Sequence, residues 1–557
     1  MYNANGQGSA ATKPKVLIIG WDGATFDLIE PWVKEGRLPT LARLMNEGAW
    51  GRLRSTIPAH SGPAWATFAT GLLPGRHGVY YFVGPSRDSQ FFRPVSADSI
   101  QGRPMWDLLS EQGKSVGVIN VPLTYPTRPV NGYMIAGIFA PDAPSAFWPA
   151  ELHDEVTKAC GEYVVEVYGK LNRRATFDAI LFAINQRLKV TEYLMDHHPV
   201  EFLTVVFRML DSIQHKFWAD MDPHHTLHKE PGDTAIPDAI LRCYQTLDTA
   251  LARLIEKAGP EATVILISDH GFRGEYRRLA INKWLQDNGL LALQRGSASL
   301  MGRLIGLAKQ LGLHKTLGNL VRVAGGARYR RSLAQRQNLI YRTIDWTRTQ
   351  VVYGPNYGLN INLQGRDPQG IVTAAEYEAL RDRLITGLLE LRDPSTGLPL
   401  VAAVYRREEV YSGDAVDLAP DLVLKMAEYE TNGRRWGFGL DSNPAAWQLV
   451  TLPTLRMSGD HSPDGIFLAR GPHVRPGQVE GWQIADIAPT ALYAMGVPVP
   501  AAMEGVVRSE LFDPAYVAAN PVAFAEVDLG VDGQAALVTA GDQASVVEQR
   551  LAELGYL

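Results

Sequence analysis

The chain has 557 residues, of which 46% are hydrophobic and 20% are charged, and its formal net charge is −5 at pH 7. This length predicts about two to four domains, or one large core with insertions. The negative charge argues against a dedicated nucleic-acid-binding protein, and two cysteines provide neither a disulfide framework nor a thiolate metal site.

The first segment, residues 1–14, is small and polar, and it lacks the apolar stretch of a signal peptide. We expect it to be a disordered N-terminal segment. No apolar run in the sequence reaches the length of about 18 residues that a membrane span requires. These two observations lead us to expect a cytoplasmic protein.

Four continuous apolar runs predict strands that are buried on both faces. They cover residues 15–22, 115–120, 201–207 and 262–268, and they alternate with helical segments at 38–48, 177–195 and 239–258. This alternation predicts an α/β fold with a mainly parallel sheet covered by helices. Ligands bind beyond the carboxyl ends of such strands. Asp22, Asp211 and Asp269 lie at or just past these ends, which predicts one shared site.

Ser61 precedes Gly62 and Pro63, and residues 64–69 are predicted to be helical. Serine is favoured at a helix N-cap and proline in the first turn. Ser61 is therefore expected at a helix N-terminus, where free N–H groups and the helix dipole favour negative charge. A simple capping role would also explain this serine, so a catalytic role depends on the acids and histidines elsewhere in the chain.

Residues 288–344 contain ten lysines and arginines and no acidic residue. Leucines at 300, 304, 307 and 311 recur at helical spacing, which predicts a helical, basic cap insertion beside the sheet. Three interpretations stay open for this insertion. It could be a solvated structural face, a lid over an anionic substrate, or a membrane-surface helix within residues 295–342.

The later part of the chain predicts strands at 353–363, 400–405 and 466–469 and helices at 374–391 and 484–495. We therefore divide the chain into a first part of the catalytic core (15–290), the cap insertion with accessory strands (291–415) and a second part of the core (416–511). Residues 512–557 form a C-terminal extension to which the sequence assigns no role.

Three short motifs contain residues of the metal-ligand type. Asp211 and His215 are four residues apart, which places them on one face of a helix. Asp269 and His270 follow an apolar strand, and His461 lies in a polar stretch, 459–464, that is predicted to be a loop. Each motif alone is compatible with an ordinary polar turn or surface. Together, their oxygen and nitrogen donors suit Zn²⁺ or Mn²⁺.

The ordered set of these residues resembles the alkaline phosphatase superfamily, most closely its branch of type I phosphodiesterases and nucleotide pyrophosphatases, which includes bacterial phosphohydrolases. The resemblance covers about residues 15–290 and 417–511. Further matching phrases are Thr70-Gly71, Pro74-Gly-Arg-His-Gly78, Asp486-Ile-Ala-Pro-Thr and Gly496-Val-Pro-Val-Pro500.

The resemblance implies an alkaline-phosphatase-like fold and a centre with two divalent metal ions, zinc or manganese. Ser61 would contact the first ion and act as the nucleophile, forming a phosphoryl-serine intermediate. The implied ligands are Asp22, Asp269 and His270 for one ion and Asp211, His215 and His461 for the other.

The implied activity is that of a phosphodiesterase acting on a small-molecule, lipid or nucleotide phosphate ester. A phosphomonoesterase or a phosphotransferase with the same centre is the alternative. The branch typically has threonine as the nucleophile and a later asparagine that contacts phosphate. Here the nucleophile is Ser61 and no asparagine follows before Gly71, so Asn120 is the candidate replacement donor.

Three other functions fit the sequence less well. A sulfatase requires arginine where this chain has Trp65. A cofactor-independent phosphoglycerate mutase would carry a large insertion after the nucleophile, which we do not find in the sequence. A non-catalytic phosphate-binding protein would be expected to have lost part of the ligand set, whereas all six ligands and the serine are present.

Overall fold

The computed structural model describes residues 13–85, 92–168, 171–228, 235–294, 341, 343–354, 356–444, 446, 448–455, 457–530 and 550. Within these ranges, no helix combines the length and the apolar character needed to cross a membrane. The basic segment 295–340, which includes the leucines at 300, 304, 307 and 311, lies outside the described residues. Its helical cap and its membrane-surface interpretation therefore stay predictions.

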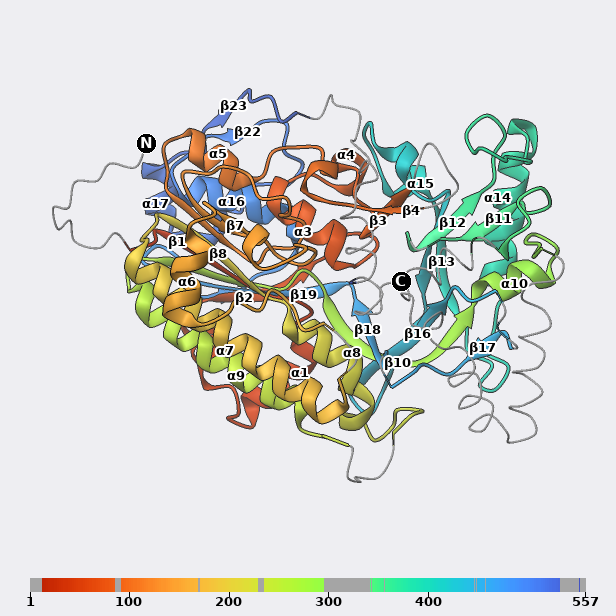
Figure 1. Cartoon of the computed structure of the whole chain (residues 1–557), viewed down its shortest axis with the longest axis horizontal. Coiled ribbons are helices and arrows are strands. Elements are labelled where there is room, and N and C mark those ends of the chain that lie inside the picture. The colour runs from red at the N-terminus through yellow and green to blue at the C-terminus, as the bar shows by residue number, and fades with distance from the viewer. Residues whose placement is uncertain are drawn as a thin grey trace.

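A large sheet forms the centre of the molecule (Figure 1). Among the described residues ten strands take part, in the order β20-β2-β19-β9-β1-β8-β5-β6-β7, with β21 beside β2. Neighbouring strands from β9 to β6 are parallel, while β19 and β7 run antiparallel to their neighbours. The five parallel strands are β1 (Val16–Trp21), β5 (Val116–Ile119), β6 (Gly132–Ile135), β8 (Phe202–Phe207) and β9 (Thr263–Ile267). The others are β2 (Ala49–Arg54), β7 (Phe147–Trp148), β19 (Asp464–Arg470), β20 (Gly477–Gln478) and β21 (Trp482–Gln483).

Helices cover both faces of this sheet (Figure 1). In β1, Leu17 and Ile19 pack into one apolar core and Val16 and Ile18 into the other, because successive side chains of a strand point to opposite faces. The first face is covered by α1 (Phe26–Lys34), α2 (Pro39–Glu47), α6 (Leu152–Cys160), α7 (Arg173–His197), α8 (Met209–Met221) and α9 (Ala239–Ala258). The second is covered by α3 (Ser61–Thr70), α5 (Met105–Glu111) and α16 (Ile487–Ala494).

Two further sheets extend from the central one. The long strand β10 (Gly271–Ala280) begins just after β9 and pairs with β16 (Arg434–Asp441), β17 (Val450–Thr451) and β18 (Gly459–Ser462), and β15 (Glu428–Thr431) pairs with β16. The other sheet has the order β11-β12-β14-β13. Its strands are β11 (Val351–Tyr353), β12 (Gly358–Ile361), β13 (Val401–Arg406) and β14 (Leu422–Met426), and α10 (Ile281–Asp287) and α14 (Ala374–Leu389) share its core.

Short elements complete the described chain. Beside α3 lie α4 (Pro74–His77) and the β3–β4 hairpin (Val83–Pro85 and Phe92–Pro94). The helix α15 (Arg407–Val410) follows β13, and α17 (Pro514–Ala519) precedes β23 (Phe524–Ala525), which pairs with β22 (Val499–Pro500).

The predicted fold class is confirmed: a mainly parallel sheet lies between two layers of helices. The predicted position of Ser61 at a helix N-terminus is also confirmed. Ser61 is the first residue of α3, and the N-cap is His60, whose Nδ1 accepts a hydrogen bond from the Gly62 N–H over 3.4 Å. One local prediction is wrong: His461 lies in a strand rather than a loop, because β18 pairs with β10 and places His461 opposite Phe272.

Candidate metal centre

The seven predicted ligand and nucleophile residues converge at one edge of the central sheet. Asp22 directly follows β1, Asp269 and His270 connect β9 to β10, and α8 begins two residues after β8. The remaining two come from the start of α3 and from β18. All seven are buried, with exposed fractions of 8% for His461 and 3% or less for Asp22, Ser61, Asp211, His215, Asp269 and His270.

Asp22, Asp269 and His270 form the first group, in which one ligand atom of each residue lies within 4.8 Å of the others. Ser61 Oγ lies 3.2 Å from Asp22 Oδ1 and 3.1 Å from His270 Nε2. Neutral N–H groups orient the two carboxylates. Trp65 Nε1 donates to Asp22 Oδ2 over 3.0 Å, and the Gly23 N–H donates to Asp269 Oδ1 over 3.2 Å.

Asp211, His215 and His461 form the second group, again with ligand atoms within 4.8 Å of one another. Asp211 Oδ1 lies 3.1 Å from the Nε2 atoms of both His215 and His461. These two nitrogens are themselves 3.0 Å apart. Three acceptor atoms this close together in a buried site require a cation or a proton between them.

The backbone fixes the tautomers of the three histidines. His215 Nδ1 donates to the Gly459 carbonyl over 2.8 Å, His270 Nδ1 to the Gly271 carbonyl over 3.0 Å, and His461 Nδ1 to the Ala59 carbonyl over 3.1 Å. Since a carbonyl oxygen can only accept, each Nδ1 carries its proton. When the rings are neutral, their Nε2 lone pairs face the centre, which is the usual arrangement of histidine metal ligands.

Burial and neighbouring charges set the protonation of these groups. Burial lowers the pKa of His270 to about 4, and burial together with His270 lowers the pKa of His461 to about 4, so both rings are neutral at pH 7. Burial and the Asp269 carboxylate raise the pKa of Asp22, because two carboxylates repel each other in a dry site. Asp269 Oδ2 is buried and accepts no hydrogen bond from the described residues. A divalent cation would offset this repulsion and satisfy that oxygen, so the donor set fits a metal ion.

A model of type I phosphodiesterases and nucleotide pyrophosphatases matches residues 16–432 of the sequence. The chain belongs to this family. It is therefore a phosphoester hydrolase of the phosphodiesterase and pyrophosphatase type, and the predicted family resemblance is confirmed. A comparison with curated proteins finds no match by sequence.

Solved structures of low sequence identity resemble this member of the phosphodiesterase family. Phosphonoacetate hydrolase from Sinorhizobium meliloti 1021, in complex with phosphonoformate, matches with a TM-score of 0.49 and 14% identity over 87% of this chain and 95% of its own. Human ectonucleotide pyrophosphatase/phosphodiesterase 5 matches with a TM-score of 0.47 and 15% identity over 90% of this chain and 100% of its own. An inactive form of the murine protein, in complex with AMP, matches with a TM-score of 0.44 and 14% identity over the same shares, 90% and 100%.

Asn120, the predicted substrate contact of this family member, follows β5 and belongs to neither ligand group. It is 1% exposed and has a φ of 60°, a left-handed conformation that asparagine tolerates better than most residues. Its Oδ1 accepts a hydrogen bond from the Tyr163 hydroxyl over 3.2 Å. Its Nδ2 has no hydrogen-bond partner among the described residues, so this amide retains a free donor.

An aromatic cluster that the sequence motifs did not reveal lies beside the centre of this family member. The His60 ring lies 4.1 Å from that of Tyr81 and 5.0 Å from that of His461, measured between centroids. Tyr357, which lies between β11 and β12 and has a φ of 58°, has its ring centroid 5.2 Å from that of Tyr81, with the two planes inclined by 36°. The run of aromatic residues at 80–82 was the available signal. Tyr357 could not be found in this way, because its contact depends on how the accessory sheet packs.

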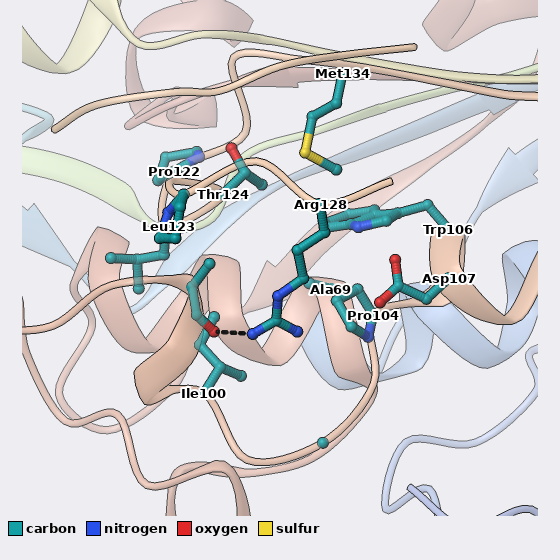
Figure 2. Close-up of a pocket in the computed structure, with 13 residues that line it drawn as sticks. Ala69, Ile100, Pro104, Trp106, Asp107, Pro122, Leu123, Thr124, Arg128 and Met134 are labelled. Atoms are coloured by element: carbon teal, nitrogen blue, oxygen red, sulfur yellow. Dashed lines mark hydrogen bonds between the residues drawn. The ribbon is translucent and has the colours of Figure 1, made fainter. Parts of the chain in front are cut away.

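A small cavity at the other end of α3 is too small to be the substrate site (Figure 2). Its volume of about 30 Å³ accommodates one or two water molecules. Ala69, Trp106, Asp107 and Arg128 contribute to its lining, and Arg128 donates a hydrogen bond to the Ala97 carbonyl over 3.2 Å. Asp107 Oδ1 is buried there without a hydrogen-bond partner in the described chain, so a bound water would satisfy it.

Proposed function

We propose that this family member is a metal-dependent phosphodiesterase in which Ser61 is the nucleophile. The observation that supports this role is the position of the Ser61 hydroxyl, 3.2 Å from Asp22 and 3.1 Å from His270. Serine at a helix start needs no such neighbours to act as a cap. Placed between a carboxylate and an imidazole, this hydroxyl can lose its proton and attack a phosphorus atom.

Asp22, Asp269 and His270 would hold one divalent ion, and Asp211, His215 and His461 would hold the second, with zinc or manganese as the ions that suit these donors. Two such ions, when bound, lower the pKa of an attacking hydroxyl and stabilise charge on a leaving oxygen. The three Nδ1–H···O=C hydrogen bonds hold the histidine rings in the orientation that this binding requires.

The chain itself favours negative charge on Ser61. Ser61 opens the helix α3, whose ten residues direct the positive end of their dipole toward its side chain. As the serine oxygen bonds to phosphorus, the bond from phosphorus to the leaving alcohol breaks, and a phosphorylated Ser61 remains. Water then cleaves this ester and restores the hydroxyl. The Asn120 Nδ2 donor is proposed to bind a non-bridging oxygen of the phosphate.

We infer a small-molecule phosphate ester, such as a nucleotide or a lipid phosphate, as the substrate. A phosphomonoesterase or phosphotransferase with the same residues is the second candidate. The free Asn120 amide supports the diester, because a neutral donor suits the single negative charge of a diester better than the double charge of a monoester.

The test compares Ser61→Ala with Ser110→Ala, a serine of α5 that hydrogen-bonds only to backbone groups. Both variants and the wild type are assayed with bis(p-nitrophenyl) phosphate and p-nitrophenyl phosphate in Zn²⁺ or Mn²⁺. We expect Ser61→Ala to lose nearly all turnover while keeping its metal content, and Ser110→Ala to retain activity. An acid quench of the wild type should trap a phosphorylated peptide containing Ser61. Turnover by Ser61→Ala within a few-fold of the wild type would overturn the proposal.

A further inference from the structure

A buried ion triad lies directly behind the metal-ligand candidate Asp211. Arg208 Nη1 donates to Asp211 Oδ2 over 2.9 Å, and Arg208 Nε donates to Glu166. The side chains of Arg208, Glu166 and Asp211 are 1%, 0% and 1% exposed. Ion pairs removed from water this completely are costly unless every donor is used. A third nitrogen of the Arg208 guanidinium is also used, because its Nη2 donates to Ser212 Oγ over 3.0 Å.

The guanidinium is held from two sides that are independent of the ligands. Arg208 is the N-cap of α8, so the helix sets its position three residues before Asp211. Glu166 belongs to the segment that follows α6, and this segment is anchored by Arg187 of α7. Arg187 Nη2 donates to the carbonyls of Val164 over 3.2 Å and Val165 over 2.7 Å. The clamp on Asp211 is therefore built into the fold.

This clamp gives the two oxygens of Asp211 different tasks. Oδ2 is taken by Arg208, whereas Oδ1 faces His215 and His461 at 3.1 Å each. A carboxylate held in this way presents one oxygen to a cation rather than two. The planar fork of arginine can bond two carboxylates at once, which the single ammonium of lysine cannot do in the same geometry.

No charged side chain among the described residues donates a hydrogen bond in this way to the carboxylates of the other ligand group. Trp65 and Gly23, both neutral, orient the carboxylates of Asp22 and Asp269. That group offers two carboxylates to a divalent ion, and the Asp211 group offers one, which a guanidinium partly neutralises. Since cation affinity rises with the negative charge of the ligands, the Asp211 group should bind the more weakly held ion.

We propose that Arg208 is a positioning residue that makes Asp211 a single-oxygen ligand, and that the Arg208–Glu166 pair sets the affinity of the Asp211, His215 and His461 group separately from the other group. This inference rests on the proposed metal-dependent function. Outer partners of this kind typically change metal affinity by about 10- to 100-fold when they are replaced.

The experiment titrates the metal-free full-length protein with Zn²⁺ against a chromophoric chelator and, in parallel, with Co²⁺ while its visible absorption is recorded. The wild type should bind two equivalents in two steps. Arg208→Lys should weaken one step by about 10- to 100-fold and leave the other within about 2-fold. The Co²⁺ absorption of the weakened step should also lose intensity, because a second Asp211 oxygen raises the coordination number of the ion. Glu166→Gln should weaken the same step, since it leaves the charge of Arg208 uncompensated.

A matched control is Arg381→Lys. Arg381 lies on α14, its side chain is 3% exposed, and it pairs with Glu378 and Glu408 away from both ligand groups. This variant loses a buried guanidinium of the same kind and should leave both binding steps unchanged. If a single substitution at the triad does not fold, the pair Arg208→Gln with Glu166→Gln removes both charges together and releases Asp211 Oδ2, and it should change the affinity of that one step alone.

Two outcomes would overturn the inference while leaving the proposed function intact. In one, a folded Arg208→Lys protein keeps both affinities of the wild type. In the other, both steps weaken equally, which would mean that Arg208 supports the fold rather than one ligand group. A wild type that binds fewer than two equivalents would instead overturn the two-metal proposal itself.

Discussion

The imidazole rings of His270 and His461 stack face to face, with their centroids 3.7 Å apart and their planes inclined by 21°. One ring belongs to the Asp22 group and the other to the Asp211 group. The two candidate metal sites are therefore adjacent and are joined through two stacked, neutral imidazole rings. Ser61, which contacts His270, therefore lies beside both groups. Replacing either histidine should measurably change the amount of bound metal.

His461→Ala should lose one of the two bound metal equivalents, because the Asp211 group then retains only two protein ligands. The remaining equivalent should stay bound, somewhat weakened by the loss of the stacked ring. We expect kcat/KM to fall by more than about 100-fold, the upper end of what the loss of a merely orienting residue costs. Metal content is measured by elemental analysis after gel filtration, alongside the rate.

The control for this variant is His473→Ala, which removes an exposed histidine that stacks on Tyr516 and belongs to neither ligand group. It should keep two equivalents and normal turnover. Two retained equivalents in His461→Ala would show that His461 is not a ligand.

Much of the fold could be predicted, because its strands are continuous apolar runs whose burial is encoded locally. Asp22 and Asp269 were placed by the ends of these strands, and His215 by its helical spacing from Asp211. Their roles as ligands stay predictions. His461 was expected in a loop, since Gly459–Ser462 has no apolar pattern and becomes a strand only by pairing with β10. The Arg208–Glu166 contact joins residues 42 positions apart with no shared periodicity, so no local pattern could reveal it.

Asn120→Ala should lower kcat for a diester substrate by about 100-fold, the scale observed when one donor to a developing negative charge is removed. Metal affinities should stay unchanged, because Asn120 belongs to neither ligand group. Tyr163→Phe removes the hydroxyl that donates to the Asn120 amide oxygen and accepts from Arg187 Nε over 3.1 Å, and its effect on kcat should be smaller. Steady-state kinetics and chelator titration of both variants check this. A shared loss of metal affinity and rate would count against a role in substrate binding.

Tyr357→Leu should raise the KM for aromatic substrates and leave the KM for aliphatic substrates unchanged. The Tyr357 ring packs against Tyr81 in a tilted contact and lies 5.6 Å from the ring of His60, so these side chains form an aromatic surface beside the centre. A stacking contact of about 1 kcal/mol predicts a rise in KM of roughly 5-fold for aryl diesters. Methyl diesters should be unaffected. Equal changes in KM for both substrate types would mean that Tyr357 only packs the accessory sheet and does not contact the substrate.

The stability of the protein at low pH should depend on His77. This residue of α4 is fully buried, its Nδ1 accepts the Val79 N–H over 3.1 Å, and its Nε2 lies 2.9 Å from Thr67 Oγ1 of α3. Burial lowers the pKa of His77 from 6.5 to about 3. In the unfolded chain the ring takes up a proton near pH 6.5, whereas the folded ring stays neutral until about pH 3.

Between these values the unfolded state binds more protons, so stability is full above pH 6.5 and is lost as the pH falls. From pH 8 to pH 5 this single group should remove about 2 kcal/mol from the free energy of unfolding. Denaturant unfolding of the wild type and of His77→Gln, both with chelator, is measured across this pH range. The difference between the two proteins in the pH dependence of the free energy of unfolding reports on His77, because the contributions of all other titrating groups cancel. His473→Gln, at an exposed position, should keep the wild-type pH dependence. If His77→Gln also keeps it, the ring is already protonated in the folded protein and the α3–α4 contact is not the acid-sensitive element.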